Sequence, residues 1–235
     1  DYGTDEEIRM VVDAGPLGYL SIAAHGHADA LALVLSVGGE EILIDPGTYA
    51  YHTQKRWRDY FRGTAAHNTV CVDHLDQSVS GGNFMWLRHA SIGAVSWQES
   101  GEGARLSAQH DGYRRLPDGV VHARSVRFER QRRRFVIEDQ LTCKAGHEVQ
   151  RFWHFGENCR VEDDGDAVTI RSGAKTVRLI FDSPSPAARN LYNGSEQPLC
   201  GWVSRRFDVK QPTFTLVESC RLDSPAKLRA VIECG

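Results

Sequence analysis

The chain has 235 residues, of which 41% are hydrophobic and 25% are charged, both ordinary for a globular protein long enough to bury a core. The formal net charge of −3 gives no reason to expect nucleic acid as a partner, and no apolar run is long enough to span a membrane. The chain opens as DYGTDEEIRM, with neither Met nor a signal peptide. We therefore expect a piece of a longer protein, with periplasm and cytoplasm both open as its compartment.

Apolar and alternating runs at short spacing predict β-strands along most of the chain. The first two span 30–37 and 41–44, and the Gly38-Gly39 pair between them predicts a hairpin turn. A second hairpin is expected over 161–168, turning at Asp164-Gly165. Further strands are expected at 67–73, 86–98, 104–112, 122–130, 133–140, 147–155, 159–163, 166–171, 175–182, 200–209 and 213–220.

Helix signals are confined to one segment, 53–62. Trp57, Tyr60 and Phe61 stand there at i, i+3 and i+4, which gives a short helix one apolar face. Residues 183–198 are expected to form the longest loop. Many short strands with turns between them predict packed antiparallel sheets. The expected fold is an all-β, multi-stranded antiparallel β-sandwich over residues 1–235, with at most one or two short helices.

The six cysteines are scattered and form no C-x-x-C pair, which argues against a structural zinc knuckle. Several of them, such as Cys71 and Cys220, stand inside apolar alternating segments. We expect buried, reduced thiols that pack as small hydrophobic groups.

Residues 25–73 hold the constellation that could carry chemistry. His25 and His27 flank a glycine, and in an extended segment positions i and i+2 project from the same face. Asp45 follows an apolar run and precedes Pro-Gly, and His67 stands at the start of another apolar run. Imidazole nitrogen and carboxylate oxygen both suit zinc, so His27, Asp45 and His67 form a plausible three-ligand site.

The same residues also have plain structural interpretations. A single strand histidine is commonly a surface residue or a hydrogen-bonded core residue. Asp45 before Pro-Gly could serve only to support the turn, which is a common use of Asp.

A resemblance to a known family favours the metal interpretation. The stretch HGHADALALVLSVGGEEILIDPGTYAYH, followed by WRDYFRGTAAHNTVCVD, resembles the signature region of the heparinase II/III-like C-terminal domain. The order of its motifs is H-x-H-x-D, then D-P-G-T-Y, then F-R-x-T-x-A-H-N-T-V. Weaker similarity continues in RFWHFGEN and GWVSRRFDV.

The resemblance implies a fold, an activity and roles for single residues. Enzymes of this family cleave acidic, uronate-containing polysaccharides by β-elimination, with an N-terminal helical domain and a C-terminal β-sandwich. The family's metal ligands fall on His27, Asp45 and His67, with zinc as the expected ion, one per chain. The histidine that lines the catalytic cleft falls on His25. Arg62 and Asn68 are the remaining candidates for substrate binding.

Three functions follow as alternatives. The first is the sandwich domain of a polysaccharide lyase, with an acidic polysaccharide and the helical domain of the same protein as partners; alone, this chain is expected to be catalytically incomplete. The second is a non-catalytic glycan-binding or structural module in polysaccharide assembly or export. The third, a zinc hydrolase, needs a general-base carboxylate beside the metal, for which Asp29 and Glu41 are the nearby candidates.

Overall fold

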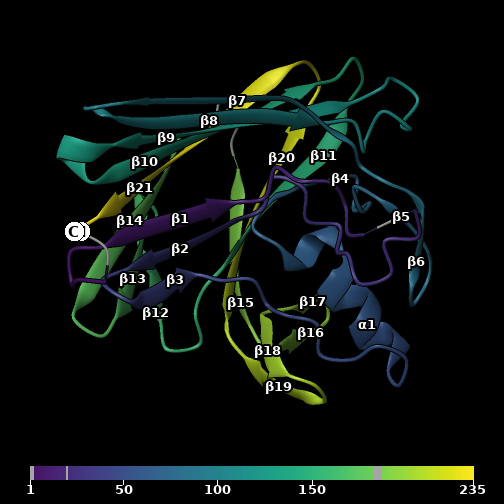
Figure 1. Ribbon diagram of the computed structural model, residues 1–235, viewed down its shortest axis with the longest axis horizontal. Helices are drawn as coiled ribbons and strands as arrows, with labels where there is room; N and C mark the ends of the chain where they lie inside the picture. The colour runs from purple at the N-terminus through teal and green to yellow at the C-terminus, as the bar shows by residue number, and fades with distance from the viewer. Residues whose placement is uncertain (1–2, 20, 183–186) are drawn as a thin grey trace.

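The computed structural model describes residues 3–19, 21–182 and 187–235, which form several antiparallel sheets and, within these ranges, a single α-helix (Figure 1). The prediction of an all-β sandwich with few helices is confirmed. No helix in the described part of the chain is long and apolar enough to cross a membrane.

The largest sheet has eight strands, in the order β12-β13-β14-β21-β10-β9-β8-β7. These strands are β7 (Ile92–Ser100), β8 (Gly103–His110), β9 (Val121–Glu129), β10 (Arg134–Thr142), β12 (Arg160–Asp163), β13 (Ala167–Ser172), β14 (Lys175–Asp182) and β21 (Ala226–Cys234).

Two smaller sheets face part of the large one. A four-stranded sheet runs in the order β15-β20-β11-β4, and a three-stranded sheet in the order β1-β2-β3. Their strands are β15 (Ala188–Asn193), β20 (Phe214–Leu222), β11 (His147–His154), β4 (Val70–Val72), β1 (Ile8–Val12), β2 (Leu33–Val37) and β3 (Glu40–Leu43).

The remaining elements are short. They are α1 (Lys55–Arg62), the 3-10 turns η1 (Thr64–Ala66) and η2 (Arg130–Arg132), and the pairs β5 (Val79–Gly82) with β6 (Met85–Arg88), β16 (Ser195–Glu196) with β17 (Leu199–Cys200), and β18 (Trp202–Arg206) with β19 (Val209–Pro212).

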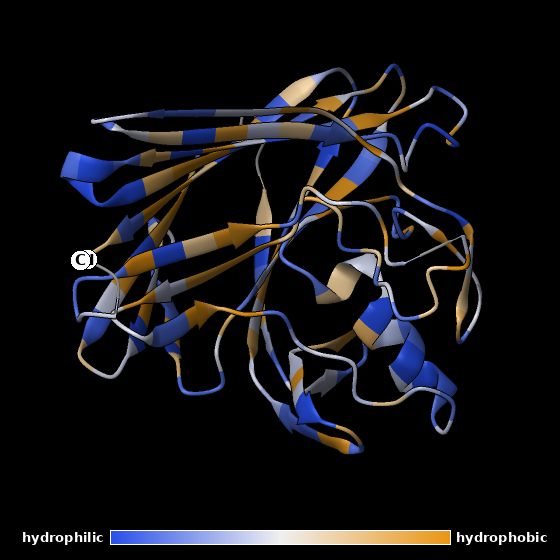
Figure 2. Cartoon of the chain, viewed as in Figure 1, coloured by the Kyte–Doolittle hydropathy of each residue, from blue (hydrophilic) through white to orange (hydrophobic). Residues whose placement is uncertain are grey.

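The main core lies between the eight-stranded sheet and the smaller sheets. Strand β2 alternates buried and half-buried residues, so Leu33, Leu35 and Val37 all point inward. They pack in one cluster with Ile137 of β10 and Ile232 of β21. Figure 2 shows the same pattern, with hydrophobic stretches along β1, β2, β3 and β21 and hydrophilic residues on α1.

Several sequence predictions are confirmed in detail. The Gly38-Gly39 turn joins β2 to β3, with both glycines at positive φ, 57° and 81°. The turn around Gly165 joins β12 to β13, and the predicted helix begins at Lys55. All six cysteines are free and buried.

Other predictions are wrong. The segment 86–98 is two strands, β6 and β7, because the chain leaves one sheet and enters another between them. The predicted loop 183–198 contains β15 and β16, while its first residues, 183–186, lie outside the described ones. Strands β1 and β21 had not been predicted, although β21 lies inside the eight-stranded sheet.

A pair of carboxylates clamps one histidine at the end of the four-stranded sheet. His147 Nδ1 lies 2.6 Å from Asp73 Oδ2, and His147 Nε2 lies 3.0 Å from Asp118 Oδ1. The clamp connects the end of β4, the loop before β9 and the start of β11. Burial lowers the pKa of His147, but the hydrogen bonds that its ring donates to Asp73 and Asp118 outweigh this effect, so the net shift is upward.

This clamp predicts a pH dependence of stability. Because the pKa of His147 is raised in the folded state, its stabilisation is fully present below the unfolded pKa, near 6.5, and is lost as the pH rises through the folded pKa. Urea unfolding at a series of pH values from acid to mildly alkaline should show a smaller loss in His147→Gln than in the wild type, in which His67 also has a raised pKa.

The matched control is His74→Gln, because His74 pairs with Glu148 at 3.1 Å on the exposed surface. Exposed pairs contribute at most about 1 kcal/mol, so this variant should keep the wild-type pH profile. A wild-type profile that is flat above pH 6.5 would contradict the assignment of the clamp.

Candidate metal centre and the surface around His25

Asp45 and His67 meet because two strand ends lie beside β11. Strand β3 ends at Leu43, which forms a bridge with Phe155, and strand β4 pairs directly with β11. Asp45 follows the first of these strands, and His67 precedes the second. Their side chains touch, with His67 Nδ1 2.8 Å from Asp45 Oδ2.

His27 comes from an irregular segment. The segment turns between Ala23 and Gly26, whose backbone groups are bonded at 2.8 Å, so the expectation of an extended strand is wrong. The two imidazoles therefore have different neighbours. The ring of His27 lies 5.2 Å from that of His67, whereas His25 faces outward.

The structure brings two of the three predicted ligands, His27 and His67, together with Asp29. One ligand atom each from His27, Asp29 and His67 lies within 4.8 Å of the other two. Asp45 lies beside this group and contacts it through the ring of His67. A hollow of ≈ 100 Å³ is lined by both Asp29 and Asp45, and a smaller one of ≈ 10 Å³ by His27 and Asp29.

Burial and the two acids set the protonation of the centre. Burial, and then the neighbouring His67, lowers the pKa of His27 to about 3, so its ring is neutral at physiological pH. Burial also opposes the charge of His67, but Asp45 raises the pKa of His67 above its ordinary value. Asp45 in turn stays ionised, because His67 holds its pKa below the usual range against the effect of burial.

These residues fit a divalent metal ion. His67 Nε2 is buried and has no hydrogen-bond partner among the described residues, which is unusual for a ring nitrogen. The nearest polar contact of His27 Nε2 is Thr48 Oγ1, at 3.4 Å. Neutral imidazoles and ionised carboxylates are the donor set that zinc accepts.

His25 lies on an aromatic surface beside this centre. Its ring makes edge contacts with Tyr51, at 5.2 Å between centroids, and with Phe84, at 6.2 Å. Phe207, at the tip of the β18–β19 hairpin, packs 4.8 Å from Tyr51. The guanidinium of Arg58 lies over the Tyr51 ring at 5.2 Å. We call His25, Tyr51, Phe84 and Phe207 the aromatic wall; Phe84 is 40% and Phe207 56% exposed.

Arg58 is a buried cation beneath this wall. It is fully buried, and its guanidinium donates to the backbone oxygen of Asn83 at 3.1 and 3.2 Å. Its NH1 group has no hydrogen-bond partner among the described residues. Positive charge therefore lies directly behind the exposed rings, which favours an anionic ligand in front of them.

The two predicted substrate-binding residues are buried. Arg62 stacks over Trp86, with its guanidinium carbon 4.1 Å from the ring centroid, and it donates to the backbone oxygen of Gly82. Asn68 is 2% exposed. A substrate contact for either side chain would require it to leave these surroundings, and both assignments stay predictions.

Asn68 connects three separate segments through its side chain. Its Nδ2 donates to the backbone oxygens of Leu33 and Ile44, each at 2.8 Å, and its Oδ1 accepts from the backbone N–H of His154 at 2.6 Å. Ile44 directly precedes Asp45, so Asn68 fixes the distance between the two halves of the Asp45–His67 pair.

Replacing Asn68 should therefore cost stability. Asn68→Ala leaves three buried backbone groups without partners, at about 1–3 kcal/mol each, so we expect a loss of several kcal/mol in urea unfolding. Asn68→Asp should be at least as damaging, because its carboxylate would face two carbonyl oxygens. A variant that folds with wild-type stability but loses glycan binding would instead assign Asn68 to the substrate.

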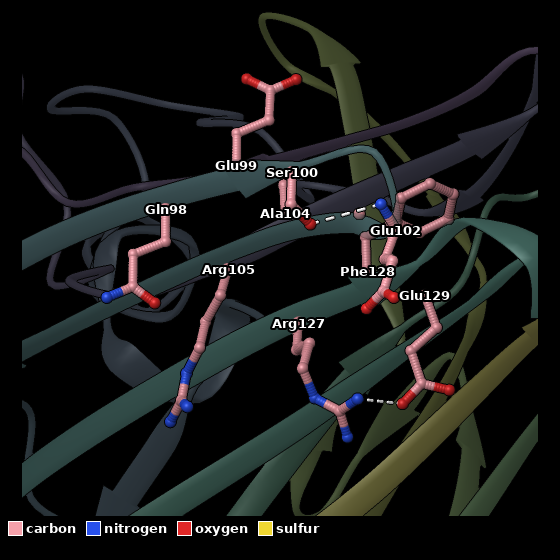
Figure 3. Close-up of a pocket in the computed structure, with 10 residues that line it drawn as sticks. Gln98, Glu99, Ser100, Glu102, Ala104, Arg105, Arg127, Phe128 and Glu129 are labelled. Atoms are coloured by element: carbon pink, nitrogen blue, oxygen red, sulfur yellow. Dashed lines mark hydrogen bonds and ion pairs between the residues drawn. The ribbon is translucent and has the colours of Figure 1, made fainter.

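Two other groups do not belong to the site. Glu41, a possible general base, is bound by Arg205 at 2.6 Å on the exposed surface and is not in the His27, Asp29 and His67 group. A separate hollow of ≈ 490 Å³ lies at the ends of β7, β8 and β9 (Figure 3). Figure 3 shows Arg105 and Arg127 there side by side, with Arg127 paired to Glu129. Its charges are mixed, and it contains no histidine.

Fold and site together define an antiparallel β-sandwich with a His/Asp centre at its strand ends. The model of the family described as heparinase II/III-like, C-terminal, matches residues 3–231. The chain therefore belongs to this family. No curated protein matches the chain.

Solved structures agree with this assignment at the level of the fold. The chain is similar to a heparinase III, the BT4657 gene product, with 19% identity and a TM-score of 0.78 over 98% of this chain and 33% of that one. It is also similar to a mutant of the heparan sulfate lyase HepC from Pedobacter heparinus, with 16% identity and a TM-score of 0.78 over 97% and 33%. The chain thus spans about a third of the length of these structures.

Sequence reasoning missed most of the aromatic wall and the cation behind it. Phe84 and Phe207 are far from His25 in sequence, and no local pattern connects them. Arg58 lies on a helix whose sequence signal is its apolar face of Trp57, Tyr60 and Phe61. Asp29 carried a usable signal, because it continues the alternation of His25 and His27 as H-x-H-x-D.

Proposed function

We propose that this chain is the sandwich domain of a polysaccharide lyase that acts on an acidic, uronate-containing glycan. In this proposal His27, Asp45 and His67 hold a zinc ion, and His25 contacts the substrate. The observation that carries the proposal is the placement of an exposed imidazole, two residues from a partly buried metal-type centre, on an aromatic wall backed by a buried cation.

The surface around His25 suits the chemistry of elimination. The reaction removes the proton at C5 of a uronate, places negative charge on the neighbouring carboxylate, and expels the glycosidic oxygen with a proton. An exposed imidazole has a ring nitrogen that can accept a proton from the substrate or donate one to it. The charge of Arg58 stabilises negative charge that develops in front of the aromatic wall. Aromatic faces are suited to contact the apolar faces of sugar rings.

The buried centre has a structural part in this proposal. Zinc would supply a fixed charge that draws the Asp45 turn, His67 and the His27 segment to one point. The chain's own residues do the rest: Asp45 holds His67, and His27 anchors the segment that presents His25. The other proton-transfer groups would come from the helical part of the longer protein, and this chain alone should not cleave.

The metal assignment predicts a loss of both ion and stability in His67→Ala. The purified wild-type chain should contain about one zinc, as expected for a single three- or four-ligand site, and the variant almost none. Metal at a hundredfold excess over its Kd stabilises a folded chain by about 2.7 kcal/mol, so the variant should also lose the rise of Tm with added zinc.

His52→Ala is the control, because His52 is an exposed histidine outside the His27, Asp29 and His67 group. It should keep both metal and Tm. Wild-type levels of zinc in His67→Ala would show that the ligands are wrongly assigned.

The glycan assignment predicts a role for His25 that is separate from folding. Alginate and heparan sulfate oligosaccharides should bind the zinc-loaded chain, and His25→Ala should weaken binding by roughly tenfold, as for the loss of one good hydrogen bond. Binding is measured by calorimetry against a neutral glucan. His25→Ala should keep the wild-type metal content and Tm. Equal affinity for acidic and neutral glycans would refute the proposal, and unsaturated product formed by this chain alone would refute its incompleteness.

A further inference from the structure

The outer face of the eight-stranded sheet has a polar surface that the proposed site does not use. In β8 the buried residues Ala108 and His110 alternate with Arg105, Ser107 and Gln109, which therefore face away from the core. A hollow of ≈ 270 Å³ lies over these three side chains and continues across β9 and β10 to β21. None of its lining residues belongs to the aromatic wall or to the metal-type centre.

Two exposed cations line this hollow, Arg105 on β8 and Lys227 on β21, with β9 and β10 between them. Neither forms an ion pair or a hydrogen bond with a described residue. The one carboxylate among the lining residues, Glu138, accepts a hydrogen bond from Ser125 Oγ at 3.4 Å. Hydroxyl and amide groups fill the space between the two cations. We call this surface the outer groove, and define it by Arg105, Ser107, Gln109, Ser125, Gln140 and Lys227.

Arg105 also lines the neighbouring hollow of ≈ 490 Å³ at the ends of β7, β8 and β9. Its cross-strand partners are Gln98 on β7 and Arg127 on β9. Figure 3 shows these three side chains pointing to one side of the sheet and Glu99 pointing to the other. Like charges directly opposite each other on neighbouring strands cost stability, so an anion bound between Arg105 and Arg127 would be favourable.

The acid nearest to these arginines is already shared. Glu129 pairs with Arg127, with Arg134 at 2.6 Å and with Arg132 at 3.7 Å, so one carboxylate serves three guanidinium groups. Glu102, in the turn between β7 and β8, adds one more negative charge. The arginines still outnumber the acids around Glu129, and positive charge is in excess on this side of the sheet.

These features suit an acidic glycan better than a protein or a nucleic acid. Guanidinium and ammonium groups bind carboxylate and sulfate groups, and amides and hydroxyls can exchange hydrogen bonds with the hydroxyls of sugars. A protein partner would need an apolar or aromatic centre, but the only apolar side chains that line the groove's hollow are alanines. Duplex DNA carries a charge about every 1.7 Å and would need a denser row of cations.

We propose that the outer groove binds a chain of acidic polysaccharide as a second, non-catalytic site. Arg105 and Lys227 hold anionic groups of the chain, and the amides and hydroxyls between them contact its sugar hydroxyls. The proposal shares its class of ligand with the proposed function and uses none of the residues assigned there. A long polymer that occupies both surfaces would be retained more strongly than a fragment that reaches only one of them.

The test measures binding of long heparan sulfate and alginate chains in a His25→Ala background, in which the surface around His25 contributes little. This background should still bind both polymers. Adding Arg105→Gln and Lys227→Gln should weaken its affinity roughly tenfold, as for the loss of two exposed charge contacts. Affinity is measured by calorimetry at low ionic strength, and Tm should not change, because both side chains are exposed.

The matched control adds Arg9→Gln and Arg160→Gln to the same background. These arginines are exposed on β1 and β12 and form no ion pair with a described residue, so the control changes the net charge equally at other places on the surface. It should bind both polymers as tightly as the background does.

The outcomes separate the outer groove from the surface around His25. The groove is refuted if His25→Ala alone abolishes binding, if the groove variant binds as tightly as the background, if the control weakens binding equally, or if the background binds a neutral glucan as tightly. A background that binds like the wild type, with loss only in the groove variant, would keep the groove and remove His25 from the proposed function. A wild-type chain that binds neither polymer would overturn both.

Discussion

The buried ion pair between Arg124 and Asp139 is the interaction on which the site depends. Arg124 Nε and Nη2 lie 2.7 and 3.1 Å from the two carboxylate oxygens of Asp139, and both side chains are buried. The third donor, Arg124 Nη1, reaches out of the eight-stranded sheet to the backbone oxygens of Leu31 and Asn68, at 2.6 and 2.7 Å. Breaking such a pair by removing one partner costs about 3–5 kcal/mol, because the other charge is left buried. Strands β9 and β10 thereby fix the two segments that carry Asp29 and His67.

Backbone carbonyl groups that need hydrogen-bond donors explain the polar side chains packed around the segment 28–33. The segment is irregular before β2 begins at Leu33, so the carbonyl groups of Ala28, Ala30 and Leu31 find no partners in a sheet and need side-chain donors instead. Thr64 Oγ1 donates to the carbonyl of Ala28, and Thr69 Oγ1 and Gln77 Nε2 both donate to that of Ala30. These bonds are inside the protein, where an unmade hydrogen bond is expensive. These bonds hold the backbone on both sides of Asp29 next to the metal-type centre.

The local sequence pattern was enough to predict some of these structural features and not others. The β2–β3 hairpin follows from Gly38-Gly39, because only glycine readily takes the two positive φ angles that the turn requires. Asn68 shows the opposite case, since its bonding partners lie 35, 24 and 86 residues away. A polar residue between polar residues looks the same in sequence whether it faces water or closes a buried network. For the same reason the sequence suggested a substrate contact for Arg62, which is buried against Trp86.

The charged groups of the site fall into two sets, one at the metal-type centre and one behind the exposed surface around His25. The surface around His25 is exposed: the imidazole of His25 and the rings of Phe84 and Phe207 reach solvent, and the buried guanidinium of Arg58 lies behind them. His27 and His25 are separated by one glycine, so an ion that fixes the first also limits where the second can point. Any effect of the metal on chemistry would then pass through this short length of backbone, as a constraint on the orientation of His25.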